Sequence, residues 1–191
     1  MKMMNMSIKK AGKIICIILI ITAAIIAAVF LNRTVIQSVR PYILLPDYSK
    51  PSSGSLYDSK YGIEFVREGR RIKAYSAPGE VIWELPGEVK AQDCILADID
   101  HDKEEELLVL CWRRGRFGKH RPTWVKHDEL KWSQHIFIYE IEDSVIRPKW
   151  MASDIGMEAV SWECSDGVLS IEDTKGEESK WVWRSWGLER L

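Results

Sequence analysis

The chain centres on residues 97–110, which read ADIDHDKEEELLVL and place an acidic turn between two apolar runs. Within the turn, Asp98, Asp100 and Asp102 are spaced two residues apart, and Glu106 follows four residues later. Alternate side chains of a tight loop point inward, so these carboxylates can surround one hard cation with oxygen ligands. An EF-hand is excluded, because a valine stands where a bidentate Glu is required and because the flanking runs are typical of strands.

The pattern from Asp98 to Glu106, followed by the apolar run 107–110, resembles the calcium-binding hairpin of FG-GAP or VCBS-type β-propeller repeats. The resemblance implies that the hairpin joins two strands of a blade, that its acidic side chains hold Ca2+, and that the domain is an extracellular adhesion or ligand-binding module. The chain departs from the family at Lys103, where a glycine usually occupies a left-handed turn position. The alternative interpretation is an acidic surface turn with solvated carboxylates.

A second unusual feature of the sequence is the uncharged apolar run from Ile14 to Leu31. It contains 18 residues and as a helix would be roughly 27 Å long. It is preceded by four lysines and by no acidic residue. The positive-inside rule therefore predicts a cytoplasmic tail (1–13), one transmembrane anchor (14–31) and an extracytoplasmic remainder in the cell membrane. A cleaved signal peptide is the competing interpretation, although no clear small-x-small cleavage site follows the run.

Charge and composition divide the rest of the chain into a linker and a folded domain. The whole chain has 27 Lys plus Arg and 28 Asp plus Glu; without the four N-terminal lysines, 23 basic residues face 28 acidic ones. This acidic balance argues against a nucleic-acid partner. Residues 32–61 contain three prolines and a Ser/Gly-rich segment, and are predicted to be a stalk. Residues 62–191 are predicted to be a β-rich domain.

In this domain, about ten short β-prone segments alternate with turn signals. They are 63–66, 71–75, 81–85, 92–97, 107–112, 134–141, 145–150, 157–164, 167–172 and 179–184. The pattern Ile-x-x-Tyr occurs at Ile72 and again at Ile136, so two similar units are expected, separated by an insertion at 113–133. The residues after the stalk are too few for four complete blades. The prediction is an all-β domain, either a partial β-propeller or stacked antiparallel sheets, after one transmembrane helix.

The insertion is basic and aromatic, and its candidate ligand-binding residues are Arg116, Lys119, His120, Arg121 and Trp124. Guanidinium and amide groups suit phosphate or carboxylate, which a cell-wall glycan or peptide would present. The alternative is a solvated loop that neutralises the acidic turn. All nine tryptophans lie beyond the apolar run. Those on strands are expected in the core, whereas Trp181 and Trp183 are either a core stripe or a platform for sugar rings.

The remaining sequence features are a possible disulfide and possible catalytic residues. Cys94 and Cys111 flank the acidic turn almost symmetrically, so they are either a cross-strand disulfide or two buried thiols. Neither the histidines nor any Ser or Cys forms a recognisable catalytic motif, so no enzymatic activity is predicted. Two functions remain: a membrane-anchored binding or adhesion module stiffened by calcium, and an accessory or sensor subunit that packs on another envelope protein.

Overall fold

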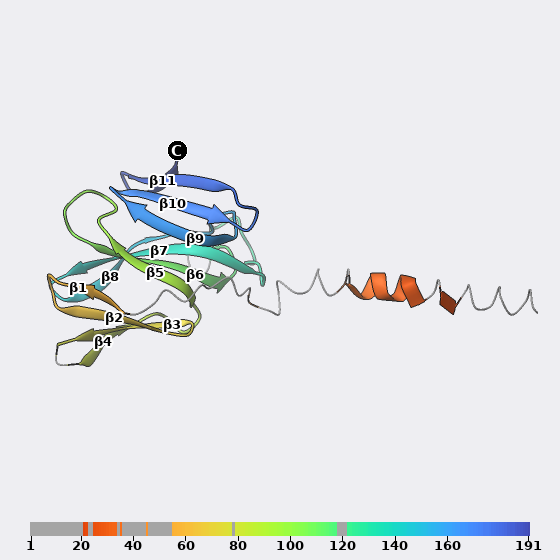
Figure 1. Ribbon diagram of the computed structural model, residues 1–191, viewed down its shortest axis with the longest axis horizontal. Helices are drawn as coiled ribbons and strands as arrows, with labels where there is room; N and C mark the ends of the chain where they lie inside the picture. Colours follow the sequence, from red (N-terminus) through yellow and green to blue (C-terminus); the bar gives the residue numbers. More distant parts are fainter. Residues whose placement is uncertain are drawn as a thin grey trace, which may run out of the picture. The chain divides into compact units, whose positions relative to one another are not determined.

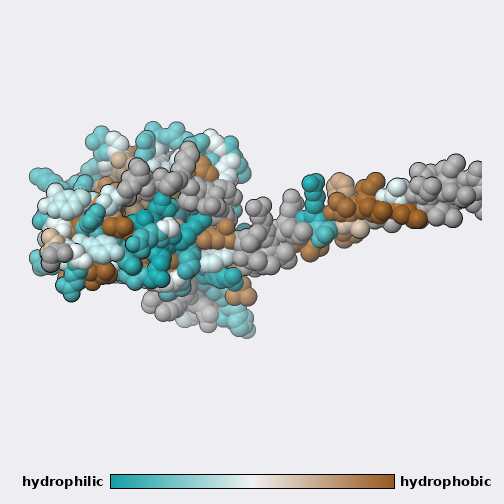
Figure 2. Space-filling view, turned by 60° about the horizontal axis from the view of Figure 1, so that its bottom comes forward, coloured by the Kyte–Doolittle hydropathy of each residue, from teal (hydrophilic) through white to brown (hydrophobic). Residues whose placement is uncertain are grey.

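The computed structural model describes residues 21–22, 25–33, 35, 45, 55–77, 79–117 and 122–191. The chain divides into two compact units, Met1–Leu44 and Leu45–Leu191. In the first unit, the described residues between 21 and 35 are helical and exposed, and their apolar side chains are the brown stretch of Figure 2. None of the helical segments that the structure describes is long and apolar enough to cross a membrane. Residues 14–20, 23 and 24 of the predicted anchor lie outside the described residues.

The second unit consists of three four-stranded antiparallel sheets, each built from four consecutive strands. The N-terminal sheet contains β1 (Leu56–Asp58), β2 (Ile63–Glu68), β3 (Arg71–Ser76) and β4 (Glu80–Glu84). The middle sheet contains β5 (Lys90–Ala97), β6 (Glu106–Arg114), β7 (Trp132–Glu142) and β8 (Val145–Met151). The C-terminal sheet contains β9 (Ala159–Ser165), β10 (Val168–Asp173), β11 (Glu178–Arg184) and β12 (Gly187–Arg190). Figure 1 shows the three sheets stacked in chain order.

Hydrophobic cores cover both faces of the middle sheet. The first core, shared with the N-terminal sheet, includes Ile63, Phe65, Ile72, Leu107 and Val109. The second core, shared with the C-terminal sheet, includes Leu108, Leu110, Ile136, Leu169 and Ile171. Successive side chains of a strand point to opposite faces, so a strand buried on both faces is apolar at every position. This burial accounts for the unbroken apolar run of β6 that follows the acidic turn.

The expectation of an all-β domain with stacked antiparallel sheets is confirmed, and each of the ten predicted segments overlaps a strand. The sheets form three units, where two were expected. The strands β1 and β12 were not predicted; β1 falls within the range assigned to the stalk, and it pairs with β2. The two copies of Ile-x-x-Tyr lie on β3 and β7, which are the third strands of their sheets. The weak repeat therefore marked equivalent positions in neighbouring sheets.

The tryptophans include a partly buried group at the cores and an exposed group. Those that pack against the two cores are Trp83, Trp150, Trp162, Trp181 and Trp183. Trp181 and Trp183 are thus a core stripe of the C-terminal sheet and not a platform for sugars. Trp124 and Trp186 are 81% and 80% exposed.

The hairpin register decides between the two interpretations of the cysteines. Cys94 lies opposite Val109, and a bulge between Ala91 and Asp93 places Cys111 opposite Ala91. Both thiols are free and buried. The cross-strand disulfide is therefore wrong. Burial raises the pKa of the Cys94 thiol to about 12, and it raises the pKa of the Cys111 thiol further.

A buried network of amides joins the middle sheet to the start of β9. Gln134 Oε1 accepts from the backbone N–H of Ala159 at 2.6 Å, and Gln134 Nε2 donates to the carbonyl oxygen of Ala159 at 3.0 Å. Gln92 Nε2 donates to the same carbonyl at 2.9 Å. Gln92 Oε1 accepts from Trp112 Nε1 at 2.7 Å and from Gln134 Nε2 at 2.8 Å. The Gln134 side chain pairs with Ala159 much as a neighbouring strand would.

Candidate functional site

The acidic turn connects β5 to β6, and its conformation is held by its own carboxylates. Asp98 Oδ2 accepts from the backbone N–H of Lys103 at 3.0 Å, and Asp102 Oδ1 accepts from that of Glu104 at 2.8 Å. His101 and Lys103 have φ values of 66° and 75°, in the left-handed region. Lys103 therefore occupies a backbone conformation that glycine adopts most readily.

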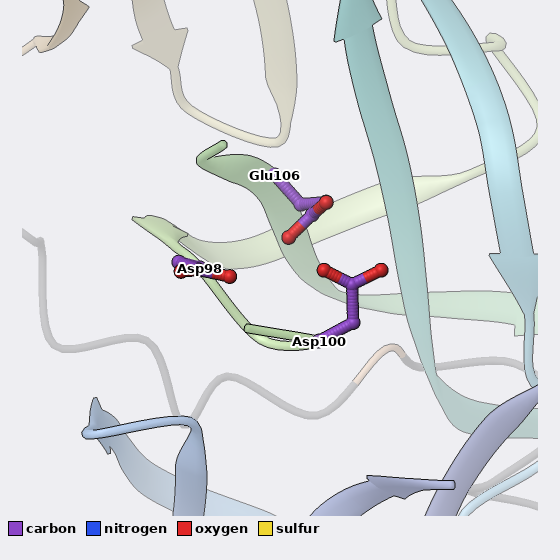
Figure 3. Close-up of side chains that lie close together, drawn as sticks. All are labelled: Asp98, Asp100 and Glu106. Atoms are coloured by element: carbon purple, nitrogen blue, oxygen red, sulfur yellow. The ribbon is translucent and has the colours of Figure 1, made fainter. Parts of the chain in front are cut away.

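Three of the four predicted ligands come together. Asp98, Asp100 and Glu106 each offer a carboxylate oxygen, and these oxygens all lie within 4.8 Å of one another. Figure 3 shows the carboxylates of Asp100 and Glu106 facing each other, with Asp98 at the side. Asp102 stands apart from this group, with a side chain that is 50% exposed. We call Asp98, Asp100 and Glu106 the carboxylate cluster.

The cluster already contains a cation of the protein itself. The ammonium nitrogen Nζ of Lys149, on β8, lies 2.6 Å from Asp100 Oδ2 and 2.5 Å from Glu106 Oε1. It is 4.0 Å from Asp102 Oδ2. The side chains of Lys149 and Asp100 are each 15% exposed, and that of Glu106 is 2% exposed. Sequence reasoning missed Lys149, because it lies 43 positions from Glu106 in the chain and no spacing rule connects them.

The pKa shifts in the cluster reflect the competition between burial and pairing. Burial raises the pKa of Glu106, against the opposing effects of the Lys149 ammonium and of the N–H of Ile99. Burial alone would lower the pKa of Lys149, but its hydrogen bonds with Asp100 and Glu106 outweigh this effect and raise it. Lys149 therefore carries its charge at neutral pH.

The residues of the cluster nevertheless fit a divalent cation. Asp98 Oδ1 and Asp100 Oδ1 are buried and have no hydrogen-bond partner within the part of the chain that the structure describes. Orphaned buried carboxylate oxygens are costly, and they are the ligand atoms that hard cations prefer. One ammonium neutralises only part of the charge of three carboxylates. Asp98, Asp100 and Glu106 would hold such an ion, which would supply the missing positive charge.

The basic loop between β6 and β7 lies at the opposite end of the middle sheet. The side chain of Asp128 holds its base, accepting from the backbone N–H of Arg116 at 2.8 Å and from that of Phe117 at 3.1 Å. Gly115 has a φ of 85°, and a Cβ there would lie 2.3 Å from Asp128 Oδ2. Of the predicted ligand-binding residues, Arg116 and Trp124 are described. The other three, Lys119, His120 and Arg121, lie outside the described residues.

A cleft of about 720 Å³ opens beside this loop, between the ends of the middle and C-terminal sheets. Its charged lining consists of Lys131, Asp154, Glu158, Asp173, Lys175, Glu177 and Arg190. Trp132 also lines it; its indole Nε1 is buried and finds no hydrogen-bond partner among the described residues. The guanidinium of Arg114 lies 5.1 Å from the Trp132 ring centroid. No sequence pattern indicated the cleft, because its walls come from five separate segments.

A buried histidine connects the base of the loop to the core. His135 is fully buried; its Nδ1 lies 3.0 Å from the carbonyl oxygen of Ala152, and its Nε2 lies 2.9 Å from Ser133 Oγ. Ser133 Oγ is in turn 2.9 Å from the carbonyl oxygen of Gly115. Burial lowers the pKa of His135, and the nearby charge of Arg113 acts in the same direction. This histidine is a structural link and has no metal ligands around it in the described part of the chain.

The exposed tryptophans do not gather at the cleft. Trp124 lies in the basic loop, whereas Trp186 follows β11 at the end that carries the acidic turn, since Trp183 lies beside Lys149. The two are therefore displayed at opposite ends of the sheets.

Comparisons with protein-family models, with curated proteins and with solved structures find no match to this chain. The resemblance to FG-GAP and VCBS repeats accordingly rests on the residues of the acidic hairpin.

Proposed function

We propose that the chain is a membrane-anchored, extracytoplasmic binding module, a propeller-like stack of three blades whose ligand enters the cleft beside the basic loop. The observation that carries this proposal is the cleft of about 720 Å³, which is lined in part by Trp132, a residue whose buried indole N–H has no hydrogen-bond partner among the described residues. A buried donor without a partner costs roughly 1–3 kcal/mol. A ligand that shifts the Trp132 side chain enough to expose this N–H, and that supplies an acceptor, removes this cost.

The lining of the cleft favours a polar ligand with both donors and acceptors. Both basic side chains and carboxylates line the opening. Arg116 Nε lies 3.3 Å from Asp154 Oδ2, so the loop base is tied to the cleft wall. A cell-wall glycan with anionic substituents presents the hydroxyl, amide and carboxylate groups that such a lining can bind.

The acidic hairpin serves this module as a structural cation site. We propose that Ca2+ binds the carboxylate cluster and stiffens the β5–β6 connection, which lies at the end of the middle sheet away from the cleft. Extracellular calcium is plentiful, so a dissociation constant on the order of 0.1–1 mM suffices. Supporting observations are the convergence of three carboxylates within 4.8 Å and the two buried carboxylate oxygens without partners.

Binding is tested with the full-length chain in a non-ionic detergent and purified cell-wall glycan as the probe. Trp132→Phe keeps the aromatic ring and removes the N–H, so retention on the glycan should fall at least fivefold. Trp186→Phe is the matched control at the opposite end of the sheets and should bind like the wild type. Equal binding by both variants and the wild type would refute the assignment of the cleft.

The membrane orientation has a separate test. The four lysines before the apolar run support a cytoplasmic N-terminus. A protease added to spheroplasts should remove an epitope placed after Leu191 and spare one placed before Lys2. Equal protection of both epitopes would contradict the proposed orientation.

The alternative function, an accessory or sensor subunit, is favoured by the outer face of the N-terminal sheet. Tyr57, Glu64, Tyr75 and Val81 form one cross-strand row on this face. Tyr57 is 62% exposed and Val81 49%. Apolar groups in such a row are typical of a face that another protein covers. In this case the wild type should retain an envelope protein and no glycan, and Val81→Lys should release that protein.

A further inference from the structure

We infer that Lys149 is an exchangeable internal counter-ion: a divalent cation that binds the carboxylate cluster displaces the Lys149 ammonium from Asp100 and Glu106. This inference rests on the proposed cation site, and it adds a specific residue that sets the affinity of that site. It concerns a side chain on β8, outside the hairpin that carries the carboxylates.

The geometry makes the two cations mutually exclusive. Lys149 Nζ is within 2.6 Å of both Asp100 Oδ2 and Glu106 Oε1, which is contact distance for a charge-assisted hydrogen bond. A calcium ion needs carboxylate oxygens at 2.3–2.6 Å. An ion that used these oxygens would lie close to the ammonium inside a site from which solvent is largely excluded. Repulsion between like charges is strong there, because it is weakly screened.

The structure also shows a place to which the ammonium can move. Lys149 Nζ lies 5.6 Å from the ring centroid of Trp183 on β11, within the range of a cation–π contact. Trp183 is held edge-on against Trp150, with ring centroids 6.4 Å apart. A shift of the long, flexible lysine side chain away from the carboxylates can therefore keep the favourable contact with the indole. It needs no movement of a strand.

Two consequences follow for the cation site. Lys149 stabilises the hairpin when no divalent cation is present, because its ammonium offsets part of the repulsion between the carboxylates. The same residue competes with the cation and weakens its binding, so the site fills only at high cation concentration. Removal of the ammonium should strengthen calcium binding at least tenfold.

The first test uses the unmodified full-length chain and amine acetylation, read by peptide mass spectrometry. In EDTA, Lys149 should react slowly, because its side chain is 15% exposed and doubly paired. In 5 mM calcium, its acetylation rate should rise at least fivefold. Lys180, which is exposed on the C-terminal sheet, is the internal control and should react at the same rate in both conditions. A Lys149 rate that does not change while calcium binds would overturn the exchange.

The second test compares calcium affinity in the wild type, Lys149→Met and Lys149→Arg, measured by tryptophan emission and by calorimetry. Lys149→Met keeps the unbranched apolar stem and should bind calcium at least tenfold more tightly than the wild type, whereas Lys149→Arg should bind no more tightly. Equal affinity of wild type and Lys149→Met would refute the exchange and leave the cation site standing. Absence of calcium binding in the wild type and in Lys149→Met would refute both the cation site and the exchange. If Lys149→Met folds only with calcium present, that dependence supports the exchange.

Discussion

Replacing Gln134 by leucine should destabilise the domain, because the Gln134 side chain replaces a missing strand beside Ala159. In the wild type, Gln134 Oε1 is the acceptor for the buried N–H of Ala159. Leucine has a similar size and no acceptor, so this N–H loses its partner. The carbonyl oxygen of Ala159 keeps the hydrogen bond from Gln92. The variant therefore leaves one orphaned donor.

An orphaned buried donor costs about 1–3 kcal/mol, so about 2 kcal/mol is expected for Gln134→Leu. For a domain of this size, that corresponds to a decrease of roughly 8 °C in Tm. The assay is urea unfolding of the full-length chain, followed by tryptophan emission. The denaturant midpoint should fall with an unchanged slope, because the surface exposed on unfolding is the same.

The variant Gln134→Glu tests the same role of the Gln134 side chain through the pH dependence of stability. A glutamate oxygen in place of Nε2 would face the carbonyl oxygen of Ala159 and Gln92 Oε1, and burial would raise its folded-state pKa above that of the unfolded chain. The unfolded state then releases its proton first, so the stability deficit grows as pH rises above about 4.3. A loss below 0.5 kcal/mol in Gln134→Leu, or a pH-independent deficit in Gln134→Glu, would refute this role of Gln134.

Three further predictions concern the core, the turn and the buried histidine. Leu110→Ala should cost about 2–5 kcal/mol in urea unfolding, because this side chain is 1% exposed in the second core; a cost below 1 kcal/mol would contradict the two-sided burial of β6. Lys103→Gly should be neutral or stabilise by up to about 1 kcal/mol, since φ is 75°, and a clear loss of stability would argue against the left-handed turn. His135 has a pKa that is lower in the folded state than its ordinary value of 6.5, so the unfolded state binds the proton first. Stability should therefore fall as pH decreases through 6.5, and His135→Gln should remove this part of the slope; an unchanged slope would contradict the burial argument.

The sequence alone predicted the class of fold, because strand signals are local. Alternating apolar residues and turn residues identify strands without knowledge of their neighbours. The acidic hairpin was predicted for the same reason, since Asp98, Asp100 and Glu106 lie within nine positions of one another and the turn brings them together. The two strands that were missed, β1 and β12, are three and four residues long, too short for a periodic pattern.

Contacts between distant segments decided what the sequence could not show. The register set at the turn, in which Ala97 lies opposite Glu106, places Val109 and not Cys111 opposite Cys94, although the symmetric spacing of the cysteines about the turn favoured a pair. Stacking of three sheets assigned Trp181 and Trp183 to the core, because only a neighbouring sheet can bury a strand face. The packing of the middle and C-terminal sheets also forms the cleft that Trp132 lines.

Lys149 illustrates the physical reason most directly. In the sequence it is one of many basic residues on a strand, and nothing in its neighbourhood indicates a partner. Pairing of β7 with β8 brings it to the acidic turn, where Asp100 and Glu106 surround its ammonium. Local spacing in the sequence determined which carboxylates converge, whereas the packing of β8 placed the Lys149 ammonium beside two of them.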